Sequence, residues 1–140
     1  MKRRERTKIF IEYAQDEVKD LARDIERDNE IEIIQEPKEG LAMIKVRETA
    51  KNTLFYLGEV LITETKVRIG DQVGIGVVKG NDYELSKSLA IADAAYELNL
   101  PILEKWNPIF NKCQEEGLEL LNKNRNIVAR TKVDFETMND

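Results

Sequence analysis

The residue types that usually carry chemistry are scarce in this sequence. Its 140 residues include one cysteine, Cys113, and no histidine. Histidine is the usual general base near neutral pH, a common metal ligand and the central member of a Ser-His-Asp triad. A single cysteine cannot form an intrachain disulfide or hold an iron–sulfur cluster, which takes several thiolates. The sequence therefore predicts no catalytic residue, no cofactor-binding residue and no metal ligand.

Cys113 and three glycines could each be given a chemical role, but a structural role is the better interpretation of both. Cys113 lies within an expected helix with no histidine to activate it, so we interpret it as a buried structural thiol rather than a reactive one. Gly74, Gly76 and Gly80 invite comparison with a phosphate-binding loop, but no GxGxxG or GxxxxGK[ST] pattern is present. Glycines within a strand more often permit close approach of a neighbouring backbone or side chain. We prefer that interpretation here.

Apolar and β-branched residues predict four strands, which must position any binding surface. The expected strands cover residues 31–34, 41–46, 54–69 and 73–78, with Pro37 and Gly40 in the connection between the first two. Lys51-Asn52 and Gly70-Asp71 stand where tight hairpin turns join neighbouring strands. The pattern therefore indicates a four-stranded antiparallel meander.

The third expected strand is apolar on both faces in its first half. Strict alternation places Leu54, Tyr56, Val60 and Ile62 on one face and Phe55, Leu57 and Leu61 on the other. The helices of one small domain can cover one face and part of the second, so we expect an apolar remainder to bind a partner or a second copy. Glu59 shares the second face, where it must be paired, exposed at an edge or raised in pKa. We interpret it as paired with a partner subunit.

Helices are expected on both sides of this sheet in the sequence. Residues 1–30 carry a helical apolar stripe, Val18, Leu21, Ala22 and Ile25, and Asp16 could cap a second helix. The basic residues between positions 2 and 8 are interpreted as a solvated end, with docking on an acidic partner as the alternative. A second helical region runs from Asn81, in capping-box spacing with Glu84, to Asn99. Asn107-Pro108 is typical of the start of a last helix that runs towards Val128.

The C-terminal residues 131–140 lack helical periodicity. In an extended conformation Val133 and Phe135 point to one side, so we expect this tail to act as an assembly hook on a partner. The predicted fold is a single α+β domain, residues 1–140, with N-terminal helices, a four-stranded antiparallel sheet, C-terminal helices and an extended tail. The predicted partner interface comprises Phe55, Leu57, Glu59, Leu61, Val133, Phe135 and Met138.

Composition excludes some classes of partner. The net charge of -5 and pI near 5.0 argue against nucleic acid or an anionic membrane as the main partner. The basic start is followed by only three apolar residues, 9–11, which is too few for an export signal. No segment approaches the roughly 20 apolar residues that a membrane span needs. With its single cysteine, the chain is expected to be soluble and cytoplasmic.

A set of ordered segments carries a resemblance to a known family. They are P-x-x-G-L-x-M at 37–43, F-x-L-G-E-V-x-I-T at 55–63, V-R-I at 67–69, Gly74, V-K-G-x-D at 78–82, A-x-A-D-A at 90–94 and T-K-V-D-F-x-T-M at 131–138. In order and spacing these resemble the PhnG family, the G subunit of the carbon–phosphorus lyase core complex. The resemblance covers nearly the whole chain. Glu64, Asn81 and Glu136 depart from the family pattern, which tends to have Arg, Arg and Phe there.

The resemblance implies a role in organophosphonate catabolism. In that family the G subunit acts with the H, I and L subunits to replace the adenine of ATP by a phosphonate, which gives a ribose 1-phosphonate 5-triphosphate. The J subunit later breaks the carbon–phosphorus bond. The implied partners are therefore chiefly the I subunit, also H, J and L, with a homodimer when the chain is isolated. The chain alone is expected to be non-catalytic, and the alternative is a self-assembling regulatory or ligand-binding module of similar fold.

Overall fold

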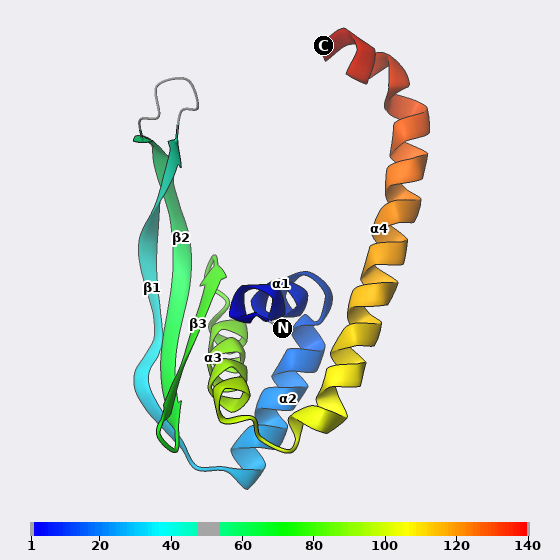
Figure 1. The fold of residues 1–140 in the computed structure, drawn as a ribbon. Helices are drawn as coiled ribbons and strands as arrows, with labels where there is room; N and C mark the ends of the chain where they lie inside the picture. Colours follow the sequence, from blue (N-terminus) through cyan, green and yellow to red (C-terminus); the bar gives the residue numbers. More distant parts are fainter. Residues whose placement is uncertain (1, 48–53, 140) are drawn as a thin grey trace.

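The computed structural model describes the backbone of residues 2–47 and 54–139, and the side chains of residues 2–45 and 57–124. Four helices and three strands follow one another in this part of the chain (Figure 1). They are α1 (Arg3–Tyr13), α2 (Gln15–Asp28), β1 (Ile31–Arg47), β2 (Leu54–Ile69), β3 (Gln72–Lys79), α3 (Tyr83–Leu98) and α4 (Leu103–Asn139).

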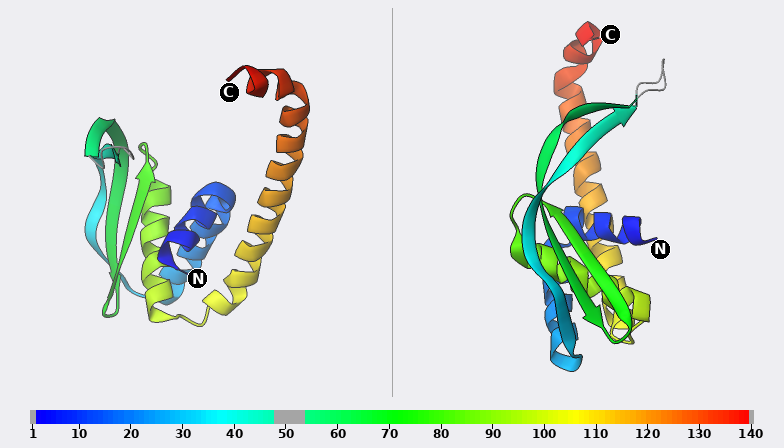
Figure 2. Two further views of the ribbon diagram at one scale, coloured as in Figure 1. Left: turned by 45° about the horizontal axis from the view of Figure 1, so that its top comes forward. Right: turned by 90° about the vertical axis from the view of Figure 1, so that its left-hand side faces the viewer.

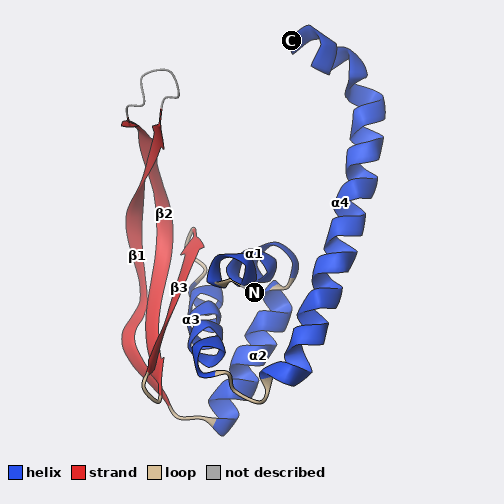
Figure 3. Ribbon diagram, in the orientation of Figure 1, coloured by secondary structure: helices blue, strands red, loops and turns tan. Residues whose placement is uncertain are grey.

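The strands form one antiparallel sheet in the order β1-β2-β3, and α3 packs against it (Figures 2 and 3). All four helices lie on the same side of the sheet, so its other face is bare of any described element. The expected α+β class is confirmed, but the four-stranded sheet is wrong because the sheet has three strands. The expected turn at Gly70-Asp71 is confirmed between β2 and β3. The turn expected at Lys51-Asn52 lies outside the described residues.

Strand β1 replaces the first two expected strands. Pro37 and Gly40 do not interrupt it, although its register with β2 shifts between Ile33 and Gln35 and again between Gln35 and Lys38. Such shifts let a strand absorb extra residues and bend without ending. Proline is tolerated here because β1 is an edge strand, where a missing amide hydrogen can face away from the neighbouring strand.

Small residues let α3 lie directly on β3. A Cβ added to Gly74 would stand 2.0 Å from the Ala90 carbonyl oxygen, and one added to Gly76 would stand 2.0 Å from the Ser86 carbonyl oxygen. Both distances are far below van der Waals contact, so only glycine fits. The preferred interpretation of the strand glycines as close-approach residues is therefore confirmed, and the approaching group is the backbone of α3.

Buried hydroxyl groups fix the position of α3 on the sheet. The Ser86 Oγ donates to the Gly76 carbonyl oxygen at 2.9 Å and lies 2.8 Å from the Thr65 Oγ1. Thr63 Oγ1 donates to the Gly80 carbonyl oxygen at 2.7 Å. All three side chains are fully buried. Because buried hydroxyls need hydrogen-bond partners, these contacts favour one position of the helix over others.

Helix α1 ends at Tyr13, and Ala14 separates it from α2, two residues before the expected cap at Asp16.

The basic residues of α1 hold this helix against α3. Arg3 Nε donates to the Asp93 carboxylate of α3 at 2.8 Å, and the guanidinium of Arg6 lies 3.5 Å from the same carboxylate and 4.5 Å from the centre of the Tyr96 ring. The interpretation of this basic segment as a solvated end is therefore wrong for Arg6, whose side chain is 12% exposed, whereas Arg3 is 54% exposed although it is paired.

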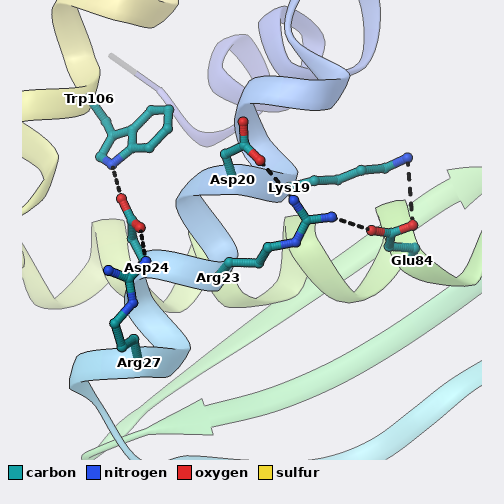
Figure 4. Close-up of polar contacts among 7 residues, drawn as sticks. All are labelled: Lys19, Asp20, Arg23, Asp24, Arg27, Glu84 and Trp106. Atoms are coloured by element: carbon teal, nitrogen blue, oxygen red, sulfur yellow. Dashed lines mark hydrogen bonds and ion pairs between the residues drawn. The ribbon is translucent and has the colours of Figure 1, made fainter.

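Polar contacts also connect α2 to its neighbours (Figure 4). The Glu84 carboxylate of α3 accepts from Arg23 at 3.1 Å, and the Lys19 Nζ lies 4.0 Å from it. On the other side, Trp106 Nε1 of α4 donates to the Asp24 carboxylate at 3.1 Å. The apolar stripe of α2 is buried beneath these contacts, as its spacing predicts.

Helix α3 has the expected ends with one change of residue. The Asp82 side chain accepts from the Leu85 amide at 3.1 Å and caps the helix, one residue after the expected Asn81. Asn99 adopts the left-handed conformation, with φ 52°, and closes the helix as predicted.

Helix α4 begins at Leu103, before the expected Asn107, and carries Pro108 in its second turn. Trp106 and Phe110 bury it against the body, and Gly117 lies against the Tyr13 ring of α1. The prediction of an extended tail at residues 131–140 is wrong, because the helical backbone of α4 continues to Asn139. Extending an anchored helix adds one hydrogen bond per residue without a new nucleation cost, and no proline or glycine follows Gly117 to stop it.

Candidate assembly surface

Half of the hairpin formed by β1 and β2 projects beyond the rest of the sheet (Figure 1). Strand β3 pairs only with residues Ile62–Ile69 of β2, whereas β1 pairs with β2 along its whole length. The projecting part, residues 41–47 of β1 with residues 54–61 of β2, is called the ribbon below. It forms because both strands continue in apolar and β-branched residues after β3 has ended.

Large apolar side chains of the ribbon are exposed. Leu41 lies opposite Leu61 and Met43 lies opposite Glu59, so these four side chains share one face. Their exposed fractions are 65% for Leu41, 58% for Met43 and 41% for Leu61. Fully burying a side chain of this size is worth about 1.5 to 3 kcal/mol, so this face gains stability from any partner that covers it.

The predicted interface residues on β2 lie within this ribbon. Leu57, Glu59 and Leu61 are all exposed, and Leu57 is 59% exposed. The register shifts there: Ile44 lies opposite Gly58, but Lys45 lies opposite Tyr56. Leu57 is thus an extra residue, which interrupts the alternation used to group it with Phe55. Phe55 lies opposite Val46, and its side chain is outside the described ones.

The bare face of the sheet carries a second apolar stripe. The side chains of Val73, Ile75 and Val77 on β3 alternate with the buried Gly74, Gly76 and Val78, and each is about two-fifths exposed. Neighbouring positions on β2 are charged, because Glu64, Lys66 and Arg68 occupy that face. The apolar stripe on β3 is therefore one strand wide and is flanked by charged side chains.

The part of α4 beyond Gly117 also leaves the body (Figures 1 and 2). Leu118, Leu120 and Leu121 are between 40% and 61% exposed. The remaining predicted interface residues, Val133, Phe135 and Met138, belong to the helical backbone of α4, with side chains outside the described ones. Whether any predicted residue contacts a partner stays a prediction.

Chemically active groups do not gather on these surfaces. Partial burial raises the pKa of the Cys113 thiol, and the neighbouring Glu17 carboxylate raises it further, which disfavours the reactive thiolate. Among the described side chains, those of residues 2–45 and 57–124, no three from His, Cys, Asp or Glu group as metal ligands would. No helix in that part of the chain is long and apolar enough to cross a membrane.

A hollow at the base of the sheet has one cationic lining residue, Arg68, and that residue is already paired. It measures about 780 Å³ at the base of the sheet, between the start of β1 and the end of α3. Arg68 is its cationic lining residue, and the guanidinium of Arg68 already lies 2.6 Å from the Glu32 carboxylate.

Asp93 is the structural residue that sequence reasoning missed. Its carboxylate accepts from Arg3 and from the Ile75 amide of β3 at 3.0 Å, and only 8% of the side chain is exposed. A charged residue among buried alanines, in the run Ala92-Asp93-Ala94-Ala95, was the available signal. Buried carboxylates are paired, so the run itself implied a basic partner.

Comparison with known proteins supplies the identity that this geometry alone leaves open. The family model described as phosphonate metabolism protein PhnG matches residues 1–139. No curated protein matches the sequence. Because the match spans nearly every residue of the ribbon, the sheet and all four helices, the chain belongs to the PhnG family of phosphonate metabolism proteins.

Proposed function

We propose that this chain is an assembly subunit of the carbon–phosphorus lyase core complex. In this role it helps the I, H and L subunits to form ribose 1-phosphonate 5-triphosphate from ATP and a phosphonate in the cytoplasm. Membership of the PhnG family supports the pathway. The observation that carries the assembly role is the ribbon, whose exposed Leu41, Met43, Leu57 and Leu61 lie beyond the cover of the chain's own helices.

The exposed apolar side chains favour a protein partner over a small ligand. Contiguous exposed apolar surface on a soluble protein commonly marks a contact with another protein. The ribbon projects from the body, whereas small-ligand sites are usually concave. In this proposal the ribbon contacts the I subunit, and the end of α4, which carries Val133, Phe135 and Met138, contributes a second contact.

Adenine release from ATP in the presence of a phosphonate tests this function. The isolated chain is expected to release no adenine, the I, H and L subunits without it to release little, and all four together to release it efficiently. Turnover by the pure chain that a point substitution within it abolishes would overturn the assembly role. Full activity of the other subunits in the absence of this chain would do the same.

A further inference from the structure

We infer that the free edge of β1 at the start of the ribbon pairs with the same edge of a second copy, so that two sheets join across a two-fold axis at Leu41. This goes beyond the proposed contact with the I subunit, because it concerns the strand edge and not the ribbon face. An unpaired edge presents backbone N–H and C=O groups that readily accept another strand.

The hydrogen bonds of β2 identify which groups of β1 are free. The Leu61 carbonyl oxygen accepts from the Gly80 amide, beyond the end of β3, whereas the Glu64 carbonyl oxygen points towards β1, where it accepts from the side-chain amide of Gln35. Odd-numbered residues of β2 therefore direct their backbone towards β3, and even-numbered ones towards β1. Since Leu41 lies opposite Leu61, the N–H and C=O of Leu41 point away from β2. The same holds two residues either way, at Glu39 and Met43.

The two edges of the sheet differ in protection. On β3 the outward amide of Ile75 already donates to the Asp93 carboxylate. On β1 the two register shifts and Pro37 interrupt the first half, since proline has no amide hydrogen to offer. From Lys38 to Ile44 the pairing with β2 is regular and the side chains are mostly exposed. Residues 38–44 therefore form a short regular stretch of the β1 edge, which begins after Pro37.

That edge is complementary to itself. Glu39, Leu41 and Met43 are symmetric about Leu41, so a second copy turned by a half rotation can pair Leu41 with Leu41 and Glu39 with Met43. Every edge N–H and C=O of these residues then finds a partner. The charges agree with this register, because Glu39 lies diagonally across from Lys45 of the second copy on the same face. Leu41, which is 65% exposed, gains an apolar neighbour.

A charge-exchange experiment on the isolated chain tests this pairing, because Leu41 faces its own copy. Sedimentation velocity is expected to show a dimer for the unmodified chain. Leu41→Lys and Leu41→Glu should each weaken dimerisation at least about tenfold, through like charges and lost apolar contact. An equimolar mixture of the two should regain the dimer as a Lys–Glu pair. Leu120→Lys, at a similarly exposed position on α4, is the matched control and should leave the dimer intact.

A backbone variant separates edge pairing from side-chain effects. Leu41→Pro removes an outward amide and leaves the bonds to β2, so it should abolish the dimer while circular dichroism stays unchanged. A monomeric unmodified chain would refute self-pairing and leave the edge to a strand of another subunit. Dimers of Leu41→Lys as tight as the unmodified ones, or a mixture that stays monomeric, would refute it too. Binding of the I subunit, measured separately by co-purification, reports on the proposed function alone.

Discussion

Two glycines set the distance between the sheet and α3, and they make the most direct prediction at the scale of single residues. Gly76→Ala places a methyl group 2.0 Å from the Ser86 carbonyl oxygen and 2.6 Å from the Ala90 amide nitrogen. Both are backbone atoms, so relief requires the whole helix to move. We expect the free energy of unfolding to fall by about 3 kcal/mol, measured by urea denaturation.

The matched control for that change is Gly40→Ala. A Cβ at Gly40 meets no atom within 4 Å, and its φ is not positive. This substitution should leave the free energy of unfolding unchanged or raise it by roughly 0.5 kcal/mol, because glycine loses more backbone entropy on folding than alanine. Equal effects at Gly40 and Gly76 would contradict the close packing of α3 on β3.

Asp93 joins three elements, and its removal should be more disruptive than that of a surface ion pair. Asp93→Ala leaves the Ile75 amide without its acceptor and removes one of the two carboxylates near Arg6, whose side chain is 12% exposed. Breaking a buried pair on one side commonly lowers the free energy of unfolding by about 3 kcal/mol. Thermal or urea unfolding measures it.

The comparison for Asp93 is the exposed pair Arg68–Glu32. Arg68→Gln removes a 2.6 Å ion pair between side chains that are 44% and 61% exposed. Exposed pairs contribute about 0 to 1 kcal/mol, so the loss should be small. A larger loss at Arg68 than at Asp93 would count against the role given to Asp93 in holding α1 and the edge of β3.

Cys113 makes a prediction about pH. Burial, and then the Glu17 carboxylate, raise the pKa of its thiol, so at any pH below that value the folded chain holds less thiolate than a free thiol. Alkylation by iodoacetamide, followed from pH 7 to pH 10, should reach its half-maximal rate at a higher pH than for the unfolded chain. Glu17→Gln should shift the profile back towards neutral pH. A folded profile at lower pH than the unfolded one would contradict this.

At the scale of elements, apolar spacing located most helices and strands but misjudged where two of them end. The stripes of α2 and α3 and the turn at Gly70-Asp71 follow local rules of spacing and turn chemistry. Pro37 was interpreted as a break, because proline usually interrupts a strand. Its tolerance in β1 depends on that strand being at the edge, and this depends on which strands pair across the sheet.

The candidate assembly surface was also predictable from the sequence only in part. Apolar residues on both sides of the ribbon were visible in the sequence, because alternation of residue types is local. The extra residue at Leu57 was not, since a register shift is a property of two paired strands. Nor was the pairing of Arg3 and Arg6 with Asp93, because those residues are some 90 positions apart along the chain.

Deleting the end of α4 makes a prediction about that element. Trp106 and Phe110 hold its start in the core, whereas the exposed Leu118, Leu120 and Leu121 lie where it leaves the body. A chain that stops after Ala129 should therefore fold with a nearly unchanged melting temperature and bind the I subunit far more weakly. Calorimetry and co-purification measure the two effects. A truncated chain that assembles as well as the intact one would remove residues 130–140 from the interface, and one that fails to fold would assign them to the core.

At the scale of the molecule, the helices cover one face of a sheet whose ribbon extends past them (Figure 1). The core beneath α1, α2 and α3 accounts for folding without the ribbon, because its buried apolar residues come from the helices and from the part of the sheet that β3 covers. Stability and assembly are therefore expected to respond to different substitutions.

Leu57→Asp tests this separation. Leu57 is 59% exposed, so an aspartate there should change the free energy of unfolding by no more than about 0.5 kcal/mol. In a complex that buries the position, the same change removes an apolar contact and places an uncompensated charge in the interface. Co-purification with the I subunit should then weaken at least about tenfold. Ile34→Asp, 47% exposed in the part of β1 outside the ribbon, is the control for a general effect of added charge and should weaken assembly less. Assembly that survives Leu57→Asp unchanged would place the interface away from the ribbon, whereas loss of folding would assign Leu57 to the core of the chain.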